Sequence, residues 1–227
     1  MATQRPIHKP ADVPAIVPVF PLAGALLLPR AELPLNIFEP RYLAMVDDAL
    51  AGHRLIAMVQ PDDGSVEGDE ESEAGPTLFK VGCLGRLTQF AETDDGRYLV
   101  TLTGICRFRI AEELVVDTPY RQCRIDASAF ALDFEESAGE DAVDRSALLT
   151  ALAAFLEANK LEVDWEGIRQ ASTETLVNAL SVMSPYGTLE KQALLEAEDL
   201  KARAEMLVAI TQMMLARMPG DGETSLQ

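Results

Sequence analysis

The sequence is short of the residues on which most catalytic and metal sites depend. Its 227 residues include two histidines, His8 and His53, and three cysteines, Cys83, Cys106 and Cys123. An odd number of cysteines at spacings of 23 and 17 residues fits neither a disulfide framework nor a CxxC metal knuckle. We predict reduced cysteines, half-buried in strands, and we expect neither a metal site nor a cofactor.

The motifs of common hydrolases are missing as well. There is no Gly-Lys pair, which excludes the phosphate-binding loop of P-loop NTPases, and there is no GxSxG elbow. His53 follows the end of a predicted helix, where its cation would favour the negative pole of that helix. We therefore predict no catalytic residue and no enzyme. A hydrolase would need a Cys or Ser side chain beside His53, and only the structure can show whether one lies there.

Long apolar runs and an excess of basic residues are absent too. No uninterrupted run reaches the roughly 18 apolar residues of a membrane span, and the polar N-terminus does not resemble a signal peptide, so we expect a cytoplasmic protein. Lys and Arg number 19 against 37 Asp and Glu, a net charge of −18. Nucleic acid and anionic membranes are therefore poor partners. The apolar content of 48% is that of a globular protein.

The first half of the chain has the pattern of short strands. Apolar runs at 17–20, 25–28, 33–38 and 54–60 are separated by Pro and Gly, which indicates edge strands and sharp bends. Residues 78–91 and 97–110 flank "TDDGR", whose Asp95-Gly96 pair favours a tight hairpin turn with positive φ angles. The acidic stretch at 62–75 predicts a surface loop.

One helix is predicted within this strand-rich half. Glu39 stands at or near its N-cap, Pro40 suits its first position, and apolar residues follow at helical spacing up to Gly52. A fold-forming role explains the cluster Glu39-Pro40-Arg41-Tyr42: Glu39 accepts amide hydrogen bonds, and Tyr42 with Phe38 fills the joint. Direct contact with a bound peptide is the alternative.

The second half changes to helical periodicity. Apolar stripes are predicted at Leu148, Ala151, Leu152 and Phe155, at Leu176, Val177, Leu180 and Met183, and along 189–197 and 200–218, with Met206, Met213 and Met214 as core residues. Ser172 and Asp199 are expected to cap helices. We divide the chain into a tail (1–13), a strand-rich part (14–127), a helical bundle (138–218) and a second tail (219–227).

Four stretches together resemble the N-terminal domain of the Lon protease family, in its stand-alone bacterial form without the ATPase and peptidase domains. They are "VPVFPLAGALLLPRAELPLNIFEPRYLAMVDDAL", "VGCLGRLTQF", "DDGRYLVTLTGICRFRI" and "LEKQALLEAEDLKARAEML", and they occur in the family's order. The resemblance implies an α+β fold: a PUA-like, bent β-barrel with one inserted helix, then a helical bundle. It also implies a domain that binds unfolded or tagged polypeptides without cutting them.

Two functions from different classes follow from these observations. The first is a polypeptide-binding or protein-partner module, for which a weak homo-oligomer is left open. The second is a small-ligand regulatory sensor that uses the arginines of the strands, because Arg107 and Arg109 alternate with apolar residues and could join Arg86, Arg97, Arg121 and Arg124 in a cationic stripe. The candidate binding residues for the two functions are Phe38, Glu39, Arg41, Tyr42, Arg107 and Arg109.

Overall fold

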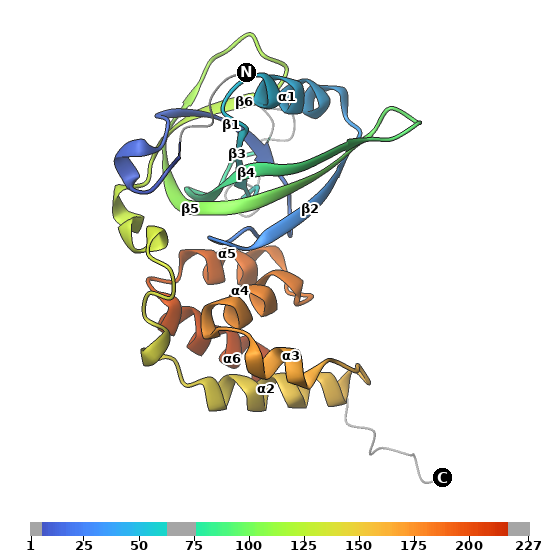
Figure 1. Ribbon diagram of the computed structural model, residues 1–227, viewed down its shortest axis with the longest axis vertical. Helices are drawn as coiled ribbons and strands as arrows, with labels where there is room; N and C mark the ends of the chain where they lie inside the picture. Colours follow the sequence, from blue (N-terminus) through green and yellow to red (C-terminus); the bar gives the residue numbers. More distant parts are fainter. Residues whose placement is uncertain (1–5, 63–75, 218–227) are drawn as a thin grey trace.

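A computed structural model describes residues 6–62 and 76–217, and its fold is α+β, as the sequence predicts. Strands dominate the first half and helices the second, and Figure 1 shows them as two stacked layers, with α1 at the end of the sheet far from the other helices. The strands are β1 (Ile16–Pro21), β2 (Glu32–Ile37), β3 (Leu55–Val59), β4 (Val81–Glu92), β5 (Tyr98–Leu114) and β6 (Arg121–Asp126). The α-helices are α1 (Pro40–Ala51), α2 (Arg145–Ala158), α3 (Trp165–Gln170), α4 (Thr173–Met183), α5 (Thr188–Glu196) and α6 (Leu200–Arg217). Short 3-10 helices are η1 (Pro10–Asp12), η2 (Ser128–Phe134) and η3 (Glu140–Ala142).

The strands form one sheet in the order β2-β5-β4-β3-β1-β6. β1 and β3 are parallel, and the other pairs are antiparallel. The long β5 pairs with β2 through its first residues and with β6 through its last. β6 also pairs with β1. The pairings therefore run from β5 through β4, β3, β1 and β6 back to β5 and form a closed path. β2 stands outside this path, as a strand at the end of the order.

The predicted strand at 25–28 is wrong. These residues have no regular secondary structure, yet Leu26, Leu27 and Leu28 are almost completely buried. The two residues that follow Pro29 fasten the chain to β5 by backbone hydrogen bonds, from the N–H of Arg30 to the carbonyl of Gly104 and from the N–H of Gly104 to the carbonyl of Ala31. The apolar run therefore fills the core as a loop.

Helix α1 matches its prediction in length but not in its cap. Pro40 is its first residue and Tyr42, Met45, Val46 and Ala49 are buried. Glu39 occupies the N-cap position, but its side chain makes no capping hydrogen bond, so that part of the prediction is wrong. Its carbonyl oxygen accepts the N–H groups of Tyr42 and Leu43.

The β4–β5 hairpin is confirmed, with a different turn. Gly96 takes a positive φ of 77°, whereas Asp95 does not. The N–H of Gly96 donates to the carbonyl of Thr93, and the N–H of Thr93 donates to the carbonyl of Arg97. A single left-handed glycine therefore closes the turn, where a two-residue turn would need two residues with positive φ.

The helical half confirms the predicted caps and most of the apolar stripes. Ser172 accepts a hydrogen bond from the N–H of Thr175 at 3.1 Å, and Asp199 accepts one from the N–H of Ala202 at 2.8 Å. Met213 is exposed, so its assignment to the core is wrong, and Met183, the last residue of the α4 stripe, is exposed as well. Helix α3 was not predicted, because six residues are too few to show a helical period.

The two halves share one hydrophobic core. A single cluster of buried side chains runs from Phe20 and Leu28 in the strand-rich half to Leu148, Leu194 and Leu207 in the helical half. A second cluster lies within the sheet, and Ile7 and Val13, from the segment expected to be a loose tail, pack against it. No helix among residues 6–62 and 76–217 is long and apolar enough to cross a membrane.

Candidate functional site

The cluster at the start of α1 divides into one buried residue and three surface residues. Tyr42 is buried, with its ring centroid 4.3 Å from that of Phe20. Arg41 lies over the Tyr42 ring and pairs with Glu39, Nη2 to Oε2, at 2.7 Å. Phe38 is 62% exposed, so it does not fill the joint between sheet and helix as expected. Phe38, Glu39 and Arg41 remain candidates for contact with a partner.

Arg107 has a different place from the one its sequence pattern indicates. It was expected on an exposed basic face, but it is 3% exposed and pairs with Asp133, Nη2 to Oδ1, at 2.8 Å. It also donates to the carbonyl oxygens of Leu195 (3.2 Å) and Ala197, and its guanidinium lies 4.7 Å from the ring of Phe130. The residue therefore fastens β5 to the C-terminal end of α5, where a cation is electrostatically favoured.

The other arginines do not form a cationic stripe. Arg109 is exposed, but Arg97, Arg121 and Arg124 are each paired with a nearby carboxylate. With Arg107 buried and these charges compensated, the anion-binding surface that a small-ligand sensor would need is not assembled from these residues. Figure 1 also separates α1 from the helical layer that Arg107 contacts, so the six candidate residues occupy two places.

A second buried arginine was not predicted. Arg203 of α6 donates to the carbonyl of Leu194 at 2.9 Å and to the side-chain oxygen of Asn178 at 3.2 Å. Burial lowers the pKa of Arg203 to about 10, so it is still protonated at pH 7. It ties α6 to α5 and α4, and nothing in its sequence neighbourhood distinguishes it from an exposed helical arginine.

The nucleophile candidates lie inside the sheet. All three cysteines are buried free thiols. Burial raises the pKa of Cys106 to about 12 and that of Cys123 to about 11, and it raises the pKa of Cys83 well above its ordinary value. Because the thiolate is the reactive form, these side chains are unreactive at neutral pH. His53 is exposed at the end of α1. Within the part of the chain that the structure describes, no three His, Cys, Asp or Glu residues gather as metal ligands.

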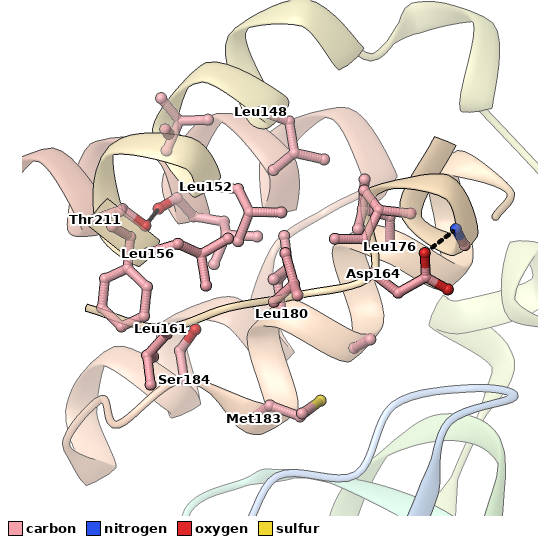
Figure 2. A pocket seen from close by; sticks show the side chains of 18 of the residues that line it. Leu148, Leu152, Leu156, Leu161, Asp164, Leu176, Leu180, Met183, Ser184 and Thr211 are labelled. Atoms are coloured by element: carbon pink, nitrogen blue, oxygen red, sulfur yellow. Dashed lines mark hydrogen bonds between the residues drawn. The ribbon is translucent and has the colours of Figure 1, made fainter. Parts of the chain in front are cut away.

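A strongly apolar concave surface lies in the helical half (Figure 2). Helices α2 and α4 both pack on α6, and the space between them is a pocket of about 540 Å³, named here the apolar pocket. Buried leucines form its walls: Leu148, Leu152 and Leu156 from α2, Leu176 from α4 and Leu207 from α6. Leu161 and Met183 line it and are exposed, and Met183 is 81% exposed.

Three polar side chains around the apolar pocket, those of Tyr186, Thr211 and Asp164, are hydrogen-bonded within the protein. The hydroxyl groups of Tyr186 and Thr211 lie 2.7 Å apart, and that of Thr211 donates to the carbonyl of Leu207. Asp164 caps α3 by accepting the N–H groups of Glu166 and Gly167 at 3.0 and 3.1 Å. The pocket thus offers apolar surface and few polar groups that could orient a substrate for chemistry.

Sequence reasoning missed this pocket because the apolar stripes of α2 and α4 predict which helix faces are buried, and not whether a hollow remains between them. The signal that could have revealed it is the stretch Leu161-Glu162-Val163-Asp164, which alternates apolar and acidic residues outside any helix. All four residues line the pocket.

Two further grooves lie near the strand-rich half. The hairpin groove, about 520 Å³, is lined by residues of β2, β4 and β5, including the exposed Phe90 and Leu99. The junction groove, about 250 Å³, lies between Arg30 to Glu32 and helix α4. The junction groove and the apolar pocket share Ala179 and Met183, so the two hollows adjoin.

Comparison with known proteins places this geometry in a family. The family described as "ATP-dependent protease La (LON) substrate-binding domain" matches residues 16–212. The chain is similar to Lon protease 2 of Myxococcus xanthus, with 28% identity over 92% of this chain and 25% of that protein. It is also similar to the Lon protease of Anaeromyxobacter dehalogenans, with 27% identity over 88% of this chain and 23% of that protein. The chain spans about a quarter of the length of these relatives.

Two solved structures share the fold. The Lon N-terminal domain protein from Xanthomonas campestris superposes with a TM-score of 0.59 and 23% identity, covering 90% of this chain and 99% of that one. The N-terminal domain of the Mycobacterium avium complex Lon protease gives a TM-score of 0.63 and 18% identity, covering 87% of this chain and 98% of that one.

Proposed function

The chain belongs to the family of LON substrate-binding domains, and from this premise we propose that it is a non-catalytic module that binds unfolded or tagged polypeptide segments. The substrates of a protease are polypeptides, so a substrate-binding domain of this family presents a surface for them. We propose no enzymatic activity for the chain itself.

One observation supports this proposal most strongly: the apolar pocket with its exposed apolar rim. Exposed apolar surface next to a concave apolar wall is a common feature of sites that bind other proteins. A side chain of a partner that leaves water for such a wall gains about 25 cal/mol for each Å² of apolar surface buried. Folded proteins keep such side chains inside, so the pocket would favour unfolded segments over folded ones.

Other features support the rest of the proposal. The closed path of strand pairings supports a PUA-like barrel for residues 14–127, with the helical bundle at 138–218. The unpaired side of β2 offers main-chain groups to an extended segment, as in strand addition. We also propose a cytoplasmic location. We expect that neither nucleic acid nor membrane is a partner, because the net charge of −18 would repel their phosphates. A weak homo-oligomer belongs to the same proposal.

A matched pair of substitutions tests the binding site. Met183→Glu places a charge on the rim of the apolar pocket, whereas Leu189→Glu makes a similar change on α5, at a side chain that is 69% exposed and lies outside all three hollows. Both positions are exposed, so both variants should fold. We expect Met183→Glu to weaken binding of an unfolded, apolar-rich polypeptide about tenfold, which is about 1.4 kcal/mol, and Leu189→Glu to leave it unchanged.

The measurement is fluorescence anisotropy of a labelled, permanently unfolded protein titrated with each variant. A Leu99→Glu variant probes the hairpin groove in the same assay. Loss of binding in Leu99→Glu but not in Met183→Glu would move the site to the hairpin groove, and absence of binding in the unmodified chain would refute the proposed function.

A further inference from the structure

We infer that the apolar pocket selects apolar segments that carry lysine or arginine next to the apolar residues. This inference rests on the proposed polypeptide-binding function and names the class of segment that the site prefers. Its basis is the charge on the wall and rim of the pocket, together with the groove that adjoins it.

The charged residues that line the apolar pocket are both acidic. Of its lining residues, Glu162 and Asp164 carry charge, and neither lysine nor arginine is among them. The two acids stand in the non-helical link between α2 and α3, alternating with the apolar Leu161 and Val163, which are exposed. An apolar segment seated in the pocket therefore has carboxylates beside it.

The Asp164 carboxylate keeps its place whether or not the pocket is filled. Its Oδ1 atom accepts the first amide groups of α3, so the side chain is fixed by the fold. The basic residues that flank the link in sequence, Lys160 and Arg169, are exposed and do not line the pocket. Among residues 6–62 and 76–217 neither Glu162 nor Asp164 forms an ion pair, so a cation on the bound segment would supply the first one.

The adjoining junction groove also carries acidic side chains. A segment that leaves the apolar pocket across Met183 reaches this groove, which Glu32 and Glu174 line. The one arginine there, Arg30, is bonded to Glu174 and to the carbonyl of Asp133. The wider field has the same sign, because residues 126–227 hold 19 acidic and 7 basic side chains. Such a field also attracts a basic segment before contact.

Trp165 provides a built-in probe of the site. It is the only tryptophan of the chain, it is 36% exposed, and it directly follows Asp164. Its fluorescence can be followed during titration with three synthetic peptides that lack tryptophan and share one apolar centre. One peptide has neutral flanks, one has lysine flanks and one has glutamate flanks.

We expect the lysine-flanked peptide to bind about threefold to tenfold more tightly than the glutamate-flanked one, the neutral peptide lying between them. The difference should shrink when salt is raised from about 0.05 M to about 0.5 M, because exposed charges are screened. The double variant Glu162→Gln, Asp164→Asn should abolish most of it. Asparagine is also a good N-cap, so α3 is retained.

Glu157→Gln is the matched control, since Glu157 is exposed on α2 and does not line the pocket. It should keep the full preference for lysine flanks. If the neutral peptide binds and the flanks make no difference, or if the control loses the preference as fully as the double variant, the inference is wrong and the proposed function stands. If none of the peptides binds, both fail.

Discussion

At the scale of single residues, the buried thiols show how surroundings set chemistry. Cys83, Cys106 and Cys123 lie on β4, β5 and β6 and have almost no exposed surface. Their raised pKa values result mainly from burial, which disfavours the charged thiolate. The sequence predicts strand cysteines without a disulfide, which is confirmed, but the expected half-burial is wrong because all three side chains are fully buried.

These thiols should make the protein less stable at alkaline pH. An unfolded thiol has a pKa of about 8.5, so above that pH the unfolded chain loses protons that the folded chain still holds. The free energy of unfolding therefore falls as pH rises, and each contribution is lost progressively up to the folded pKa, about 11 for Cys123 and about 12 for Cys106. Between about pH 8 and about pH 9.5 we expect a loss of about 1 kcal/mol for each buried thiol, measured by urea unfolding in reducing buffer.

The Cys106→Ala, Cys123→Ala double variant controls for other groups that titrate in this range. Its stability should depend less steeply on pH than that of the unmodified chain. Equal slopes for the two proteins would show that the thiols do not cause the alkaline loss.

At the scale of elements, two glycines of the β4–β5 hairpin are required for different reasons: one because a side chain would be crowded, the other because of its backbone conformation. A Cβ atom at Gly104 would overlap the carbonyl oxygen of Leu28, because the buried 25–28 loop crosses β5 there. A Cβ atom at Gly96 meets nothing within 4 Å, and the cost there arises only from the positive φ. We expect Gly104→Ala to lower the free energy of unfolding by about 2–4 kcal/mol and Gly96→Ala by about 1–2 kcal/mol. Urea unfolding measures the loss of stability in both variants. A smaller loss for Gly104→Ala than for Gly96→Ala would contradict the close contact of the 25–28 loop with β5 at Gly104.

Elements with a local cause could be predicted from the sequence. Helix α1 has Pro40 at its start and a regular apolar face, helix α4 has Ser172 as its cap, and the hairpin has Gly96 in its turn. The 25–28 loop could not be predicted, because an apolar run has the same pattern whether it pairs as a strand or fills a core. Only the packing of this run against β5 at Gly104, which the sequence does not show, distinguishes a loop from a strand.

The candidate site was less predictable than the fold. Alternation along β5 predicted an exposed Arg107, but η2 and the end of α5 cover that face. The sequence of β5 itself contains no sign that these two elements pack on it. The apolar pocket depends on the distance between α2 and α4, which their sequences do not contain. The residues at the start of α1 remain candidates because Phe38 and Arg41 are exposed in the structure, although the sequence analysis expected Phe38 to fill the joint.

At the scale of the whole molecule, the two halves are joined by polar contacts as well as by the shared core. Besides Arg107, the amide of Gln60 lies 3.2 Å from that of Gln192, and Lys191 donates to the carbonyl of Gly24 at 2.8 Å. These bonds connect the strand-rich half to α5. They favour a single unfolding transition for both halves.

Removing one partner of the buried ion pair should break this coupling. Arg107→Met leaves Asp133 buried without its cation, which should cost about 3–5 kcal/mol. Trp165 fluorescence reports the helical half, and thiol reactivity reports the sheet, so urea midpoints from the two probes should coincide in the unmodified chain and separate in the variant. Arg97→Met removes an arginine from an exposed pair with Asp95 and should leave the stability almost unchanged, because solvent screens such pairs. Coincident midpoints and a small loss in Arg107→Met would contradict the role assigned to this contact.

The pairing of β6 with both β1 and β5 has a consequence for synthesis on the ribosome. Ile16 and Val17 have their partners at Arg124 and Cys123, more than a hundred positions later. Until residue 126 has left the exit tunnel, β1 is without one neighbour and the sheet stays incomplete. Contacts between distant residues slow folding, and nascent strands with unpaired edges are prone to aggregate. A pause in translation once β6 has emerged from the tunnel would therefore help the nascent protein more than a pause at any earlier strand.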